Sequence, residues 1–207
     1  GGLGDNLQYS TLPEQLTKQG NDVYIHVQNK CRNPEIFDLV WKTNPWLKGT
    51  SNLAPNCGWI GCDPHLHYPN QHLYGINKWE NLYGVPLTSG IPKVYWKSPY
   101  MPGLENTVLV DLNYSSCEHY EHTTMPVVYS EIEKRWPDAQ ALQVTFAKEV
   151  STKRFESKFP KIQIKDIWDY SAHIANCKAI VTLLSGASPL ASAIKAQEPR
   201  PDILTIK

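Results

Sequence analysis

Short apolar runs of strand type alternate with segments of helical periodicity along most of the chain. Residues 22–27 form a compact β-rich run, and residues 34–41 place apolar side chains on one helical face behind the capping residue Asn33. The predicted strands are residues 22–27, 93–96, 107–112, 142–146, 179–184 and 202–206, with a further short one near 59–60. The predicted helices are residues 7–19, 34–41, 71–83, 130–136, 166–177 and 188–195. This alternation predicts an α/β fold with a parallel sheet covered by helices on both faces.

A proline-rich segment interrupts the alternation between residues 85 and 103. Four prolines fall in this segment, and only residues 93–96 have a strand-like pattern within it. The alternation restarts near residue 106. We therefore predict two small Rossmann-like domains, residues 1–103 and 104–207, joined near residues 99–103. In the first helical pattern, Pro13 predicts a kink or a late helix start.

Composition and charge exclude several classes of protein. The 207 residues suffice for a substantial core, and 20 Lys+Arg balance 20 Asp+Glu. Zero formal net charge argues against a nucleic-acid partner bound by counterion release. The longest apolar runs are far below the ~20 residues of a membrane-spanning helix, so only a peripheral membrane contact stays open. Five cysteines without paired short spacing indicate free thiols in a cytoplasmic protein.

One loop carries residue types that bind metals. Cys57 and Cys62 are followed by His65 and His67. The cysteine spacing is wider than in structural zinc sites, and loop histidines are most simply solvent-exposed. We expect no metal and no other cofactor.

The first functional signal is the turn at residues 1–6, Gly-Gly-Leu-Gly-Asp-Asn. Gly2 and Gly4 would let backbone N–H groups approach an anion or a sugar closely, and Asn6 could join them in binding a donor phosphate. The turn lacks both the dinucleotide spacing G-x-G-x-x-G and a P-loop lysine, which argues against NAD enzymes and NTPases. Asp5 is either a catalytic carboxylate or a helix N-cap.

The second signal is the turn that follows the apolar run at residues 179–184. Ser185, Gly186, Ala187 and Ser188 precede or open a helix of small residues. At the positive end of that helix they could hold a phosphate. The alternative is simple capping, with Ser188 as the N-cap and Pro189 at the first helical position.

A third candidate segment follows the predicted strand at residues 107–112. Asn113, Ser115 and Ser116 lie where α/β sheets place ligands, at the carboxyl end of a strand. We expect these residues to form the wall of a ligand cleft.

Together the two turns resemble glycosyltransferases of the GT-B type. Residues 1–5 are similar to the N-terminal Gly-Gly-Leu-Gly-Asp of glycogen and starch synthases and to the Gly-Asp of the ADP-heptose:lipopolysaccharide heptosyltransferases (glycosyltransferase family 9). Residues 185–191 are similar to the heptosyltransferase segment Ser-Gly-x-x-His-Leu-Ala, with Pro189 in place of the histidine. The resemblance covers both ends of the chain and the order of elements between them.

The resemblance implies a metal-independent transferase with a cleft between two Rossmann-like domains. It implies that Asp5 deprotonates the acceptor hydroxyl and that residues 185–188 bind the donor diphosphate. The expected partners are a nucleotide-sugar donor, as a co-substrate, and a glycan or lipopolysaccharide-type acceptor. The alternative is a relative that binds a nucleotide or glycan without turnover.

Two further expectations concern the charge of the donor site and the start of the chain. Lys148, Lys153 and Arg154 are candidates, by position, for a basic clamp on the diphosphate. A glycine-rich turn normally follows a strand, so we expect an apolar segment before Gly1 to supply one.

Overall fold

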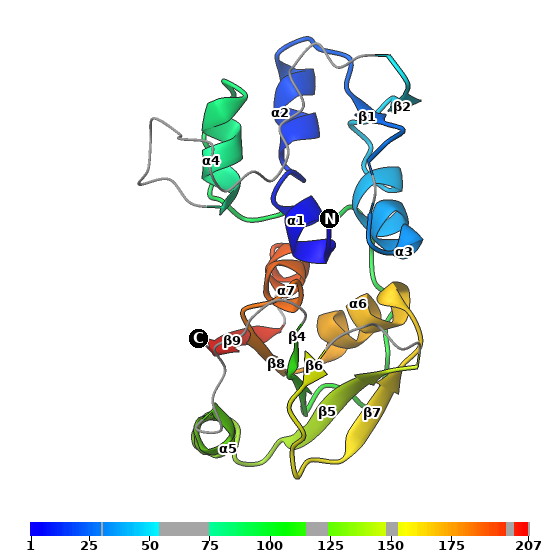
Figure 1. The fold of residues 1–207 in the computed structure, drawn as a ribbon. Coiled ribbons are helices and arrows are strands. Elements are labelled where there is room, and N and C mark those ends of the chain that lie inside the picture. Colours follow the sequence, from blue (N-terminus) through cyan, green and yellow to red (C-terminus); the bar gives the residue numbers. More distant parts are fainter. Residues whose placement is uncertain (30, 54–74, 115–123, 148–152, 198–200, 207) are drawn as a thin grey trace. The chain divides into compact units, whose positions relative to one another are not determined.

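The computed structural model describes residues 1–29, 31–53, 75–114, 124–147, 153–197 and 201–206 (Figure 1). The chain divides into two compact units, Gly1–Trp96 and Lys97–Lys207. The predicted strand near residues 59–60, the start of the helix predicted at 71–83 and the histidine-rich loop lie outside the described residues.

The first unit combines short helices with a small parallel sheet. Its elements are α1 (Leu3–Leu7), α2 (Leu12–Lys18), β1 (Tyr24–His26), α3 (Pro34–Phe37), the π-helical turn η1 (Asp38–Lys42), β2 (Gly49–Ser51) and α4 (Gly75–Leu82). β1 and β2 pair in parallel, with Tyr24 opposite Gly49. Leu12, Trp79 and Val85 form an apolar cluster that joins α2 to α4.

Two local predictions for this unit are confirmed. Pro13 lies in the first turn of α2, where its missing N–H costs no helical hydrogen bond, so the helix starts late at Leu12. Asn33 caps α3, because its side chain accepts a hydrogen bond of 3.0 Å from the Glu35 backbone N–H.

The strand predicted at residues 93–96 is wrong. This segment has no strand pairing and is held instead by contacts with residues of the α1–α2 region. The backbone N–H of Lys93 donates to Ser10 Oγ at 2.8 Å, and the Lys93 ammonium group and the Tyr95 hydroxyl both contact the Glu14 carboxylate. Pro92 removes one backbone donor next to the segment, and side-chain contacts take the place of a sheet ladder.

The second unit is a Rossmann-like α/β layer structure. Its elements are β3 (Thr107–Asp111), β4 (Asn113–Tyr114), α5 (Thr124–Arg135), β5 (Gln140–Phe146), β6 (Lys153–Arg154), β7 (Lys161–Ile164), α6 (Ile167–Asn176), β8 (Ala179–Leu183), α7 (Ala187–Lys195) and β9 (Asp202–Ile206). Five of its strands form one parallel sheet in the order β7-β5-β3-β8-β9. The predicted parallel α/β sheet is confirmed here.

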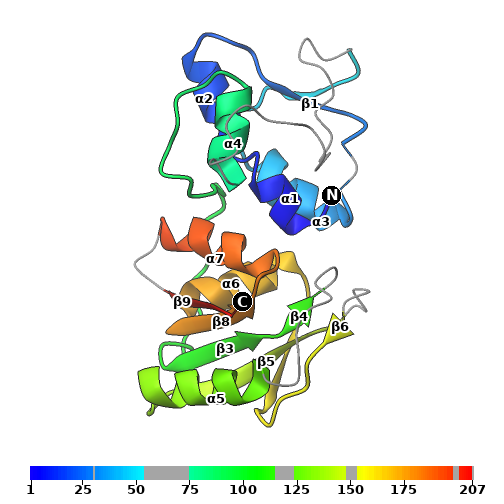
Figure 2. The ribbon, with the colours of Figure 1, turned by 60° about the vertical axis from the view of Figure 1, so that its left-hand side comes forward.

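The helices of this unit lie on both faces of the sheet. Figure 2 shows α5 on one face and α6 and α7 on the other. Val128, Ile132 and Trp136 pack from the α5 side against apolar side chains of β3 and β8. The central strands are buried on both faces, which explains their continuous apolar runs in the sequence.

Candidate functional site

The strand order of the second unit indicates the edge of the sheet at which a ligand is expected. From β3 the chain moves outward through β5 to β7, whereas from β8 it moves the opposite way to β9. Open α/β sheets bind ligands outside the carboxyl ends of the strands at such a reversal. Asp111 pairs with Thr182, so β3 and β8 end side by side. The structure thus brings together two predicted site segments, Asn113 and the turn that begins at Ser185.

The turn that begins at Ser185 leads directly into α7. The helix begins at Ala187, with Gly186 as its N-cap, and the Ala187 N–H donates to Ser185 Oγ at 3.3 Å. Ser188 lies inside the first turn, and its hydroxyl is 3.0 Å from Thr205 Oγ1 on β9. The interpretation of Ser188 as the N-cap is therefore wrong. The positive end of the α7 dipole lies at the carboxyl edge of β8, where it favours an anion.

A buried hydrogen-bond network holds the end of β3. Asp111 Oδ1 accepts from the backbone N–H and the side-chain amide of Asn113, at 2.9 and 2.6 Å. The Tyr170 hydroxyl on α6 donates to Asp111 Oδ2, and the Asn113 amide also donates to the Val144 carbonyl at 3.3 Å. Asp111 on β3 and the Val144 carbonyl on β5 thus hold the Asn113 side chain, and Tyr170 on α6 holds Asp111 in turn. Tyr170 was not identified from the sequence. The signal that could have pointed to this network is Asp111, an acid at the end of an apolar strand.

Burial governs the titration of this network. Burial raises the pKa of Asp111, and the hydrogen bonds from Tyr170 and Asn113 oppose that rise only in part. Burial, together with the nearby Asp111 charge, raises the pKa of Tyr170 well above its usual range. Tyr170 therefore remains a neutral phenol that can donate to Asp111 at neutral pH.

One of the predicted basic residues lies beside Asn113. β4 and β6 pair antiparallel, with Asn113 opposite Arg154. The Arg154 guanidinium donates to Glu156 Oε1 at 2.7 Å, so its charge is paired with that carboxylate. Ser115, Ser116 and Lys148 lie outside the described residues.

The glycine turn at residues 1–6 lies in the first unit. The Gly2 N–H donates to Asp5 Oδ2 at 2.6 Å, and Asp5 is the third residue of α1 rather than its N-cap. Gly4 is inside the same short helix. A Cβ atom on Gly1 would lie 3.0 Å from Asp5 Cβ, so a side chain there would displace the carboxylate. The turn therefore holds a half-buried carboxylate in one position.

Asn6 stabilises this turn from within. Its amide nitrogen donates to the Gly2 carbonyl at 2.8 Å, and its Oδ1 accepts from Trp41 Nε1 at 2.8 Å and from the Cys31 thiol at 3.4 Å. Asn6 is only 5% exposed. Its side chain thus ties the turn to η1 and to the loop after β1.

Replacing Asn6 by Ala is expected to destabilise the protein by about 1–3 kcal/mol, because the buried Trp41 indole N–H loses its acceptor. Urea unfolding measures the loss. Asn21→Ala is the matched control, since the Asn21 amide is exposed and donates to the Leu16 carbonyl. Equal stability of Asn6→Ala and Asn21→Ala would contradict the stabilising role of the Asn6 side chain.

Arg32 is a basic residue at this turn that sequence reasoning missed. Its backbone N–H donates to the Gly1 carbonyl at 2.8 Å. A Cβ atom on Gly2 would lie 3.7 Å from the Arg32 guanidinium carbon, so the guanidinium lies directly over the turn. A positive group therefore lies beside Asp5, brought there by the loop after β1.

Two kinds of feature are absent from the described residues. Among them, no three or more His, Cys, Asp or Glu side chains gather in a way that could hold a metal ion. The helices that they form include none with the length and apolarity needed to cross a membrane.

The comparisons with known proteins give the fold. No family model and no curated protein matches the chain. Two solved structures of TibC match all of it. One is the dodecameric iron-containing heptosyltransferase TibC in complex with ADP-D-β-D-heptose, at 14% identity and a TM-score of 0.68. The other is the iron-containing dodecameric glycosyltransferase TibC of enterotoxigenic E. coli H10407, at 15% identity and a TM-score of 0.65.

The chain shares the fold of these glycosyltransferases. It spans 56% of the length of each. The Rossmann-like glycosyltransferase fold expected from the two turns is thus supported by structural similarity.

Proposed function

We propose that the chain is a GT-B glycosyltransferase that moves a sugar from a nucleotide-sugar donor to a glycan acceptor. The observation that carries the proposal is the meeting of Asn113 and the Ser185 turn at the reversal of strand order. The likeness to a heptosyltransferase solved with ADP-heptose supports the same class of donor.

The donor site of this proposal lies at the carboxyl edge of β3 and β8. Ser185 and the first turn of α7 would bind the diphosphate through hydroxyl and backbone N–H groups, aided by the helix dipole. Asn113 would form the adjacent wall, held by Asp111 and Tyr170. Arg154 is opposite Asn113 in the β4–β6 pair and would exchange its ion pair with Glu156 for one with the departing diphosphate.

Asp5 is the catalytic base of the proposal. A sugar hydroxyl is a poor nucleophile at neutral pH, so a carboxylate must take its proton as the bond to the anomeric carbon forms. Asp5 Oδ2 is held by the Gly2 N–H, which fixes the carboxylate for this role. The first unit would thus serve the acceptor and the second unit the donor, as in a GT-B enzyme.

The donor site is tested by the affinity of Ser185→Ala for nucleoside diphosphates. We expect the dissociation constant measured by calorimetry to rise about threefold to tenfold, because one hydroxyl hydrogen bond to the phosphate is lost. Ser192→Ala is the matched control, since Ser192 lies on the same helix and donates to the Ser188 carbonyl. Unchanged affinity in Ser185→Ala, or an equal loss in both variants, would refute this donor site.

A further inference from the structure

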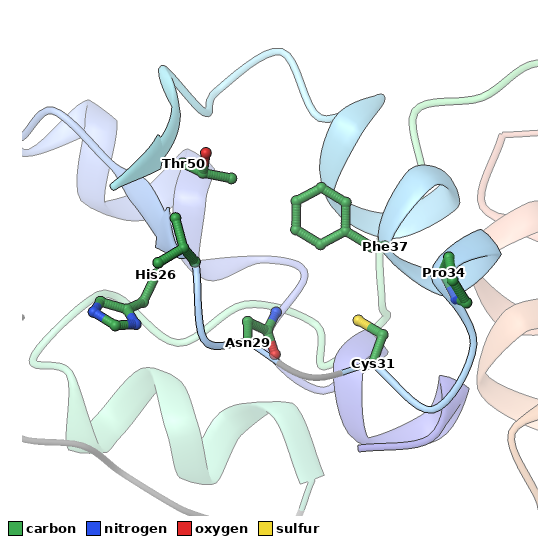
Figure 3. A pocket seen from close by; sticks show the side chains of 7 residues that line it. His26, Asn29, Cys31, Pro34, Phe37 and Thr50 are labelled. Carbon is green, nitrogen blue, oxygen red and sulfur yellow. The ribbon is translucent and has the colours of Figure 1, made fainter. Parts of the chain in front are cut away.

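The first unit contains an open pocket of about 460 Å³ beside the carboxyl ends of β1 and β2. Its apolar lining includes Pro34 and Phe37, the first and last residues of α3. Its polar lining includes Asn29, Cys31 and Thr50. Figure 3 shows the Phe37 ring between Thr50 and the Cys31 thiol, with Asn29 below it. The volume lies within the range of ~300–1,000 Å³ that is usual for small-molecule sites.

The chemistry of the lining favours a neutral ligand with hydroxyl groups. None of the seven lining residues is Asp, Glu, Lys or Arg. His26 is among these seven residues, and no Lys or Arg of the described residues lines the pocket to hold a diphosphate. The Asn29 amide and the Thr50 hydroxyl both donate and accept hydrogen bonds, and the Phe37 ring offers an apolar face. A pyranose ring has the matching combination of hydroxyl edges and an apolar face.

Two contacts connect this pocket to the turn that carries Asp5. The Cys31 thiol on the pocket wall donates to Asn6 Oδ1 at 3.4 Å. The next residue, Arg32, donates its backbone N–H to the Gly1 carbonyl at 2.8 Å. The loop that lines the pocket therefore also holds the turn.

We propose that this pocket binds one neutral saccharide unit, with Phe37 against the sugar ring and Asn29 and Thr50 on its hydroxyl groups. We assign this saccharide unit to the acceptor, and that assignment rests on the proposed function. Binding of the saccharide itself does not depend on turnover.

Cys31 provides the readout for a test on the intact chain. Burial raises the pKa of the Cys31 thiol, so its alkylation by iodoacetamide is followed at mildly alkaline pH. Peptide mass spectrometry measures the rate at Cys31 alone, with and without each of a panel of neutral hexoses and N-acetylhexosamines. Nucleoside diphosphates are added separately.

We expect at least one saccharide to slow alkylation of Cys31 in a saturable manner and nucleoside diphosphates to leave it unchanged. Asn29→Ala and Thr50→Val should each weaken this protection about threefold to tenfold. Gln28→Ala is the control, because Gln28 is exposed next to the pocket and does not line it. It should behave like the wild type.

Three results would overturn the inference: no protection by any saccharide of the panel, protection by a nucleoside diphosphate, or full protection in both lining variants. The outcome is separable from that of the proposed function. Loss of saccharide protection with intact nucleoside diphosphate binding would refute the pocket alone. Protection without any nucleotide binding would refute the transferase and keep the saccharide site.

Discussion

Replacing Asp5 by Asn is expected to lower turnover about 10²–10⁴-fold, because the amide cannot accept the proton of the acceptor hydroxyl. The substitution changes little else. An Asn side-chain oxygen can still accept the hydrogen bond that the Gly2 N–H donates to Asp5 Oδ2. The donor site proposed in the second unit keeps all its residues, so the affinity for the nucleotide sugar should stay the same. Steady-state transfer rates and calorimetry measure the two quantities.

Asp22→Asn is the matched control for this experiment. Asp22 is exposed in the same unit, and its carboxylate is 3.9 Å from the Lys48 ammonium group. Its replacement should leave turnover unchanged. Unchanged turnover in Asp5→Asn would remove Asp5 as the base. A parallel loss of donor affinity would instead point to a structural role.

The second large effect is expected at Asp111. Replacing Asp111 by Ala should destabilise the protein by about 2–4 kcal/mol, because it leaves the buried Tyr170 hydroxyl and the Asn113 backbone N–H without their acceptor. Asp111 is 3% exposed and lies at the end of the central strand β3. The loss is measured by urea unfolding. Asp138→Ala, an exposed substitution in the same unit, should cost less than about 0.5 kcal/mol.

The same carboxyl group should make stability depend on pH. Burial raises the pKa of Asp111 in the folded protein, so the folded state keeps this proton at pH values where the unfolded chain has lost it. Its contribution to stability is therefore complete below the unfolded pKa of about 4 and declines as the pH rises toward the folded pKa. Asp111→Asn should remove this decline. If the free energy of unfolding depends on pH in the same way in the wild type and in Asp111→Asn, the raised pKa of Asp111 is contradicted.

Much of the second unit could be predicted from the sequence because its central strands are continuous apolar runs between capped helices. The apolar run at residues 107–112 and the helical pattern at residues 166–177 predicted β3 and α6 almost to the residue. The edge strand β7 was missed although its residues alternate polar and apolar, because it has only four residues and lies in a lysine-rich stretch. β2 was missed because it has only three residues, of which Thr50 alone favours a strand.

The candidate site was predicted only in part, because sequence spacing does not reveal strand order. The Ser185 turn and Asn113 were each identified as strand-end residues, yet their proximity depends on the pairing of β3 with β8. Tyr170 and Arg32 come from elements remote in sequence, and tertiary packing alone places them at Asp111 and Gly2. The Phe37 pocket likewise depends on the position of α3 beside β1 and β2.

The most direct test of the account is the release of nucleoside diphosphate from a panel of nucleotide sugars, measured with the wild-type chain in the presence of neutral saccharide acceptors. The account predicts release from at least one donor, with a rate that increases with acceptor concentration. It predicts that Asp5→Asn abolishes this increase. Donor binding without any release would contradict the transferase and favour a relative that binds without turnover, and the absence of both binding and release would contradict the account as a whole.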